Sequence, residues 1–276
     1  MKALSIPFTK MSGSGNDFIL IDNRDAVVQE NGLSGWIAAV CRRKLAVGAD
    51  GLILIERSDR ADFKWRFFNA DGGQAEMCGN GGRCAARLAF LKGIAGSSLA
   101  FETMAGVIRA EVTGRRVKLE MPQPSAIDSD RTVQIDGRAV TLSHLTVGVP
   151  HVVVWVDDID TAPLKTAGPA LRYHNAFAPE GTNVNFVQRV RDGMLAIRTY
   201  ERGVEDETLA CGTGCVATAL VGFEKGLCAS PVALQTRSGE TLKIYFERTE
   251  QGFSNVFLEG EVRLIYEGRL YDEAAR

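Results

Sequence analysis

The stretch Ala75-Glu-Met-Cys-Gly-Asn-Gly-Gly-Arg-Cys84 decides the fold, because its pattern returns later as Thr208-Leu-Ala-Cys-Gly-Thr-Gly-Cys215. Each copy puts a cysteine, Cys78 or Cys211, directly before a Gly-x-Gly sequence. Each copy then leads into a run of small residues that is typical of a helix and ends in Lys-Gly. We therefore interpret the chain as two halves of one plan, with one special cysteine in each half.

A single offset of 133 residues relates the two halves. It joins Cys78 to Cys211, and it also joins four pairs of glycines. The glycine pairs are Gly15 with Gly148, Gly48 with Gly181, Gly93 with Gly226, and Gly106 with Gly239. Five landmarks that share one offset are hard to obtain by chance, so the sequence predicts an internal repeat.

The composition favours a globular protein of one large or two medium domains, since the chain has 276 residues and is 45% hydrophobic. A formal net charge of −2 and the lack of basic clusters argue against a nucleic-acid partner. No apolar run approaches the roughly 20 residues that a membrane span needs, and residues 1–10 lack the features of a signal peptide. We therefore expect a cytoplasmic protein with no nucleic-acid and no membrane partner.

The six cysteines are expected to be reduced in the cytoplasm rather than paired in disulfides. Their spacings fit no zinc pattern of the Cys-x2-Cys kind, and the three histidines are scattered along the chain. The sequence therefore predicts no bound metal. Four cysteines lie within or beside apolar runs and are assigned to the core: Cys41, Cys84, Cys215 and Cys228.

Short apolar runs between glycine turns predict a protein with many strands. Gly13-x-Gly15 is not a dinucleotide-binding loop, because a strand follows it where that motif needs a helix. Strands are expected at 18–21, 52–55, 65–68, 152–156, 184–187, 197–200 and 262–266, the last of which returns to the first half. Helices are expected at 33–44, at 79–92 and after Cys211.

We expect two similar α+β domains related by a pseudo-two-fold axis. Each domain would be a curved, mostly antiparallel sheet around a central helix. The first domain would comprise residues 1–122, completed by a C-terminal strand at 263–276, and the second would comprise 123–262. The segment 122–130, polar and with two prolines, is the predicted linker. The pseudo-symmetry would bring the two cysteine loops face to face across a cleft.

The chemistry of the two cysteines follows from their position just before a helix. Backbone N–H groups and the helix dipole there stabilise a thiolate, and the glycines let a small carboxylate approach those N–H groups. One thiolate could remove a proton from the carbon beside the carboxylate, and a thiol opposite could protonate the other face. A nucleophilic cysteine enzyme would need a paired histidine, and no histidine in the first half matches His151.

The sequence resembles the diaminopimelate epimerase family over nearly its whole length. The resemblance is carried by Met11–Phe18, Phe68–Gly72, Glu76–Cys84, Gly181–Val184, and Tyr200–Gly203 with Ala210–Gly214. It implies a two-domain, pseudo-symmetric isomerase that interconverts LL- and meso-diaminopimelate in lysine and cell-wall precursor synthesis. It also implies that Cys78 and Cys211 are the acid and base, and that no pyridoxal phosphate or other cofactor is needed.

The matched motifs imply the substrate-binding residues Asn16, Asn69, Gly79, Asn80, Asn183, Glu201, Arg202, Gly212 and Thr213. The reacting carboxylate would lie between the amides of Gly79-Asn80 and Gly212-Thr213. Arg202 would bind the far carboxylate through two parallel hydrogen bonds, and Glu201 would bind the far ammonium. Asp17 and Asp71 are expected to stabilise loops rather than to catalyse.

One residue departs from the family pattern. Val149 stands in Val149-Pro-His151 where the family often has asparagine, and the offset of 133 relates it to Asn16. One substrate-binding amide is therefore missing from this chain.

Two alternatives remain open at this point. The first is a two-cysteine racemase or epimerase for another amino acid, such as a proline derivative or histidine. The second, in a different class, is a non-catalytic amino-acid-binding protein. Arg202 and Glu201 favour a substrate with a second charged end, and thiol alkylation separates an enzyme from a binder. The partner is expected to be a small amino acid, with a homodimer as the candidate assembly.

Overall fold

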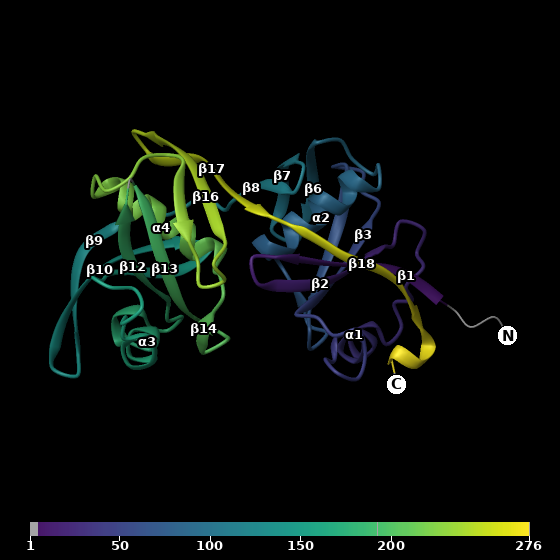
Figure 1. Ribbon diagram of the computed structural model, residues 1–276, viewed down its shortest axis with the longest axis horizontal. Helices are drawn as coiled ribbons and strands as arrows, with labels where there is room; N and C mark the ends of the chain where they lie inside the picture. The colour runs from purple at the N-terminus through teal and green to yellow at the C-terminus, as the bar shows by residue number, and fades with distance from the viewer. Residues whose placement is uncertain (1–4, 192, 276) are drawn as a thin grey trace. The chain divides into compact units, whose positions relative to one another are not determined.

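The computed structural model describes residues 5–191 and 193–275. These residues form two compact units (Figure 1). Unit 1 contains the described residues up to Leu119 together with those from Gly260 onward, and unit 2 is Glu120–Glu259. The boundaries expected from the sequence, after residues 122 and 262, lie three residues further along the chain.

Unit 1 is built on a mixed sheet with the strand order β18-β1-β2-β3-β4-β6-β7-β8. The β2–β3 and β4–β6 pairs are parallel and the other pairs are antiparallel, with the short β5 beside β4. The last strand pairs with β1, which confirms that the chain returns to its first half (Figure 1). The strands are β1 (Ser5–Gly13), β2 (Asn16–Asp22), β3 (Gly51–Glu56), β4 (Phe63–Asn69), β5 (Gln74–Ala75), β6 (Ser98–Thr103), β7 (Gly106–Thr113), β8 (Arg116–Glu120) and β18 (Arg263–Tyr271).

Unit 2 repeats this arrangement with the strand order β9-β10-β11-β12-β13-β15-β16-β17. Its two parallel pairs, β11–β12 and β13–β15, occupy the same places in the order as those of unit 1, with β14 beside β13. The predicted repeat is therefore confirmed at the level of topology. The strands are β9 (Asp128–Ile135), β10 (Arg138–Val147), β11 (Val149–Trp155), β12 (Asn183–Arg191), β13 (Met194–Glu201), β14 (Asp206–Thr208), β15 (Val232–Gln235), β16 (Thr241–Thr249) and β17 (Gly252–Glu261).

Each unit has a buried helix that begins directly after its special cysteine. These helices are α2 (Gly79–Leu91) and α4 (Gly212–Glu224), and they begin 133 residues apart, as the repeat predicts. Alanines, glycines and a cysteine fill most of their buried positions, so strands can pack closely around them. The large apolar side chains of the core come from those surrounding strands.

A second helix in each unit covers the other face of the sheet: α1 (Leu33–Cys41) in unit 1 and α3 (Leu164–Arg172) in unit 2. In β2, Phe18 and Leu20 pack in the α2 core, whereas Ile19 and Ile21 pack in the α1 core. Strands buried on both faces are continuous apolar runs, as observed here. The sequence does not predict α3, because Pro169 lies inside it. Short 3-10 turns occur at Asn175–Phe177 and Asp272–Ala275.

The glycines of the repeat share one backbone property. All eight have positive φ angles, between 66° and 116°. Because residues with a Cβ rarely adopt this region, each glycine marks a turn that both units need. The offset seen in the sequence is therefore an offset between equivalent turns.

The predicted linker at 122–130 follows the boundary between the units, after Leu119, but it is held against unit 2. Pro124 forms a β-bridge with Val147, and the Ser125 N–H donates to the Thr146 carbonyl at 2.8 Å. The strand β9 then begins at Asp128. This segment packs along unit 2, and its prolines are tolerated because an isolated bridge requires few backbone donors.

Within 5–191 and 193–275, no group of three or more histidine, cysteine or acidic side chains could hold a metal ion. In the same residues, no helix is long and apolar enough to cross a membrane.

Candidate active site

Cys78 is the N-cap of α2. Its backbone is extended, with φ −144° and ψ 115°, and its Sγ accepts a hydrogen bond from the Gly81 N–H at 3.5 Å. The first helical bond runs from the Gly82 N–H to the Cys78 carbonyl at 2.8 Å. The N–H groups of Gly79 and Asn80 belong to the first turn, where a helix leaves its donors without intrahelical partners. This turn can therefore bind an anion beside the half-buried thiol.

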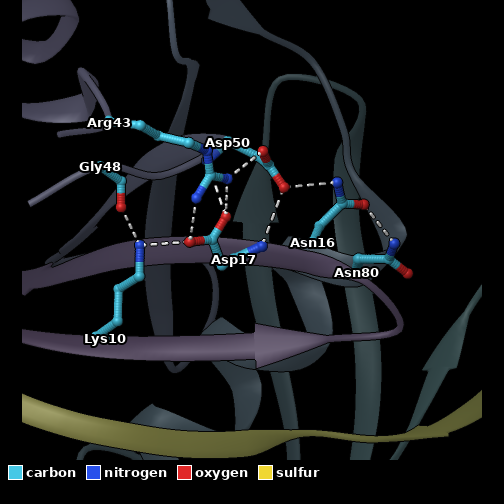
Figure 2. Close-up of polar contacts among 7 residues, drawn as sticks. All are labelled: Lys10, Asn16, Asp17, Arg43, Gly48, Asp50 and Asn80. Atoms are coloured by element: carbon cyan, nitrogen blue, oxygen red, sulfur yellow. Dashed lines mark hydrogen bonds and ion pairs between the residues drawn. The ribbon is translucent and has the colours of Figure 1, made fainter. Parts of the chain in front are cut away.

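Asn16 and Asn80 meet at this helix start. The Asn80 Nδ2 donates to the Asn16 Oδ1 at 2.7 Å (Figure 2). Phe18 pairs with Gly51, which in turn pairs with Asn69. The first residues of β2 and β3 therefore lie beside the last residues of β4, at one end of these strands. Asn69 is exposed and lies at the same end of the strands as Asn16. The predicted residues of the first half therefore lie together at one end of unit 1.

Asn16 is hydrogen-bonded to a network of charged side chains (Figure 2). The Asn16 Nδ2 donates to the Asp50 Oδ2 at 2.9 Å, and Arg43 bridges Asp50 and Asp17. Lys10, which is buried, forms an ion pair with Asp17 at 2.7 Å. Burial alone would raise the pKa of Asp17, but hydrogen bonds from Arg43 and Lys10 outweigh it and lower the pKa to about 2.

These contacts confirm that Asp17 stabilises structure. Asp71 also does so, because its Oδ1 accepts the Gly73 N–H at 2.8 Å within the predicted turn. Asp50 was not predicted to contribute. Its role depends on a contact between Asn16 in β2 and the turn before β3, which lie 34 residues apart in the sequence.

Cys211 is the N-cap of α4, with φ −114° and ψ 110°. Its Sγ lies 3.6 Å from the Thr213 Oγ1, and the Cys215 N–H donates to its carbonyl at 2.9 Å. The N–H groups of Gly212 and Thr213 therefore lead α4 as those of Gly79 and Asn80 lead α2. The predicted cysteines thus occupy equivalent positions in the two units.

The protonation of Cys211 differs from the prediction that a helix start favours a thiolate. Burial raises the pKa of the Cys211 thiol well above its usual range, and the charge of Glu201 raises it further. Hydrogen bonds from Thr213 and the Gly214 N–H oppose this shift but do not overcome it. The prediction is wrong for Cys211, because desolvation outweighs the helix start.

One end of the central strands β12 and β13 carries Glu201, Arg202 and Asn183. The Asn183 Oδ1 accepts the Arg202 N–H at 2.8 Å, and its Nδ2 donates to the Pro150 carbonyl at 3.1 Å. Glu201 accepts from the Thr208 hydroxyl at 2.7 Å, and burial raises the pKa of its carboxyl group. The Arg202 guanidinium donates to the Glu180 carbonyl at 3.2 Å. The Asn183 side chain thus links the backbone at Arg202 to the backbone at Pro150.

A buried pair of polar side chains, Asn185 and His151, lies next to the start of α4. The Asn185 Nδ2 lies 3.2 Å from the His151 Nδ1, and the Asn185 Oδ1 accepts from the Thr199 hydroxyl at 2.9 Å. Burial lowers the pKa of His151 to about 3, with further lowering by the Arg202 charge, so His151 is neutral at physiological pH. Asn185 was not predicted to contribute, although an asparagine in the apolar run from Val184 to Val187 was a usable signal.

The two units differ at this supporting position. A Cβ added at Gly81 would lie 3.2 Å from the Ile53 Cδ1, whereas a Cβ added at Gly214 would lie 2.3 Å from the Asn185 Oδ1. The Cys78 helix therefore rests on an apolar side chain and the Cys211 helix on a polar one. This asymmetry distinguishes the two cysteines within one repeated framework.

The remaining cysteines match their predicted structural role. Cys41, Cys84 and Cys215 are buried and Cys228 is half-buried. Burial raises the pKa of Cys84 to about 12 and that of Cys41 and Cys228 to about 11. These three thiols therefore stay protonated at physiological pH.

Comparison with known proteins assigns a family to this geometry. A family profile described as diaminopimelate epimerase matches residues 8–127 and 144–265. The diaminopimelate epimerase of Aquifex aeolicus is 49% identical over 277 residues, covering 96% of this chain and 98% of that protein. The corresponding protein of a Hydrogenobaculum species is 46% identical, covering 95% and 97% of the two chains.

Solved structures with lower identity share the fold. A phenazine biosynthesis protein of the PhzF family from Bacillus anthracis has a TM-score of 0.75 at 14% identity, covering 98% of this chain and 99% of that chain. A hydroxyproline epimerase from Agrobacterium vitis has a TM-score of 0.70 at 15% identity, covering 98% and 93%. These likenesses confirm the two-part, sheet-dominated fold expected from the sequence.

Proposed function

This chain belongs to the diaminopimelate epimerase family, and we propose that Cys78 and Cys211 are the acid and base of its reaction. The protein is an isomerase that interconverts LL- and meso-diaminopimelate, a step of lysine and cell-wall precursor synthesis. The matched position of the two thiols is the single observation that carries the proposal. Each is the N-cap cysteine of the buried helix in its unit.

The reaction exchanges one proton. One sulfur, as thiolate, takes the proton from the carbon beside the reacting carboxylate, and the electron pair spreads into that carboxylate as an enediolate. The other sulfur, as thiol, gives its proton to the opposite face of the carbon. The helix-start amides, Gly79-Asn80 and Gly212-Thr213, stabilise the charge as it forms. After one turnover the two sulfurs have exchanged roles.

The resting states of the two sulfurs follow from their surroundings. Burial and the charge of Glu201 raise the pKa of Cys211, which supports Cys211 as the proton donor in the resting protein. Cys78, half-buried and accepting the Gly81 N–H, is then the base. Turnover in the opposite direction begins from the reverse protonation state.

The charged groups assign the ends of the substrate. Glu201 binds the far ammonium, and the Thr208 hydroxyl holds its carboxylate through a hydrogen bond of 2.7 Å. Arg202 binds the far carboxylate, with Asn183 holding its backbone. Asn16, Asn69 and Asn80 contribute amide donors and acceptors from unit 1. Val149 adds no amide, so the backbone or these side chains take its place.

Three further features belong to the proposal. The two thiols supply both proton-transfer groups, so the reaction needs no cofactor. The formal charge of −2 and the absence of basic clusters support a cytoplasmic protein without nucleic-acid partners. A homodimer is the proposed assembly, supported by exposed apolar side chains on β18, namely Leu264, Ile265 and Tyr266.

Cysteine substitutions test the assignment. We expect Cys78→Ala and Cys211→Ala each to lower epimerase activity below about one thousandth of the parent value, because inversion needs a group on each face. Cys215→Ala is the matched control, since Cys215 lies in the same helix and is buried in its core. Parental activity in either of the first two variants would refute the proposed roles.

A further inference from the structure

We propose that Asp50 is a positioning residue, which fixes the orientation of the Asn16 amide and, through it, the Asn80 amide next to the Cys78 loop. The inference rests on the proposed function, in which Asn16 and Asn80 bind substrate. Asp50 does not need to touch the substrate in this role. It acts through the hydrogen bonds shown in Figure 2.

Four residues form a relay with one possible direction. The Arg83 Nη2 donates to the Asn80 Oδ1 at 2.9 Å, the Asn80 Nδ2 donates to the Asn16 Oδ1 at 2.7 Å, and the Asn16 Nδ2 donates to the Asp50 Oδ2 at 2.9 Å. A guanidinium only donates and a carboxylate only accepts, so both ends of the relay are fixed. Turning the Asn16 amide over would place its oxygen against the Asp50 carboxylate.

Both ends of the relay are held in place. At one end, the Asp50 Oδ1 accepts from Arg43 at 2.7 Å and its Oδ2 also accepts the Asp17 N–H at 3.1 Å. At the other end, Arg83 is fully buried and its Nη2 also donates to the Ser14 hydroxyl at 2.8 Å. The orientation of the two amides is therefore set before substrate arrives, which lowers the cost of binding.

The relay determines what the amides offer to a substrate. Each amide has two N–H donors and two acceptor sites, and the relay uses one of each. Each amide nitrogen therefore has one N–H left for the substrate, and Asp50 fixes the position of that nitrogen. Val149 occupies the equivalent of Asn16 in unit 2 and has no amide, so this relay is not repeated there.

The variant Asp50→Asn tests the proposal by changing one atom of the relay. All the groups that face Asp50 are donors, namely Arg43, the Asp17 N–H and Asn16. If the new amide keeps its oxygen on Arg43, its nitrogen faces Asn16, and Asn16 must turn over to accept. We expect KM to rise about tenfold, the equivalent of one lost hydrogen bond, while kcat changes less than about threefold.

A double-mutant cycle separates positioning from general structural support. In the Asn16→Ala background, Asp50→Asn should change KM by less than about twofold, because Asp50 then has no amide to orient. The control is Asp25→Asn, the same chemical change at an exposed aspartate that pairs with Arg57, and it should leave KM and kcat at parental values. Equal effects of Asp50→Asn in both backgrounds would overturn the proposal.

A measurement on the unsubstituted protein covers the case in which a variant does not fold or turn over. Neutron diffraction from crystals exchanged into heavy water distinguishes nitrogen from oxygen and locates deuterium. Deuterium on the Asn16 atom that faces Asp50 is the expected result, and an oxygen there would overturn the proposal. The proposed function fails separately, through an active Cys78→Ala variant, so a parental KM in Asp50→Asn beside an inactive Cys78→Ala would reject this inference alone.

Discussion

Cys78 and Cys211 occupy equivalent positions but have different neighbours. Burial and the charge of Glu201 raise the pKa of Cys211, whereas Cys78 is half-buried and accepts a backbone N–H. The Cys211 helix rests on Asn185, which contacts the neutral His151, and the Cys78 helix rests on Ile53. One repeated framework thus places an apolar side chain against the start of α2 and a polar side chain against the start of α4.

Arg202 allows a prediction at the residue scale. Arg202→Ala removes the proposed partner of the far carboxylate, and loss of such a charge pair costs on the order of 3 kcal/mol, or about 150-fold in kcat/KM. The ratio of kcat/KM between variant and parent measures this loss. Arg189→Ala, at an exposed arginine of β12, is the control. An unchanged ratio in Arg202→Ala would remove Arg202 from the site.

At the scale of elements, the glycines at the starts of α2 and α4 differ in how closely they are packed. Gly214→Ala would place a methyl group 2.3 Å from the Asn185 Oδ1, which cannot move freely because Asn185 is fully buried and bonded to Val152 and Thr199. The matched change Gly81→Ala meets its nearest atom at 3.2 Å. We expect Gly214→Ala to lower kcat at least tenfold more than Gly81→Ala, because α4 carries Cys211. Equal kcat values would show that Asn185 does not constrain the helix start.

The β1–β2 hairpin allows a prediction about pH. Asp17 has an ordinary pKa of 3.8, which its contacts lower to about 2 in the folded state. Its ion pairs therefore contribute stability above about pH 4, and this contribution is lost as the pH falls through 2. Asp17→Asn should lower the urea midpoint at pH 5 but lose less further stability than the parent between pH 4 and 2. Parallel pH profiles for the two proteins would contradict the assignment.

Much of this element structure could be predicted, because the signals are local. Buried strands such as β2 and β3 are continuous apolar runs, and the repeated turns need glycine. The helix α3 could not be predicted, because Pro169 signals a break while packing against β12 and β13 keeps the helix. The relay through Asp50 and the support from Asn185 were also missed. Both depend on which strands become neighbours, and the local pattern of residues along the chain does not reveal those neighbours.

At the scale of the whole molecule, the two units share a strand order and a buried helix that begins at a cysteine. The chain closes on itself through β18, which pairs with β1 in unit 1. Inversion of a carbon requires one proton-transfer group on each of its faces, and in the proposed mechanism each unit supplies one thiol. Loss of either unit's cysteine should therefore stop inversion even though the other unit is unchanged.

The most direct test of this account is solvent deuterium exchange during epimerisation. The protein is dialysed, treated with hydroxylamine to remove any carbonyl cofactor, and incubated in heavy water with LL-diaminopimelate. We predict that the meso product carries one deuterium at the inverted carbon without added cofactor, and that Cys78→Ala and Cys211→Ala form no meso product. Activity that returns only with pyridoxal phosphate, or meso product without deuterium, would contradict a two-cysteine mechanism.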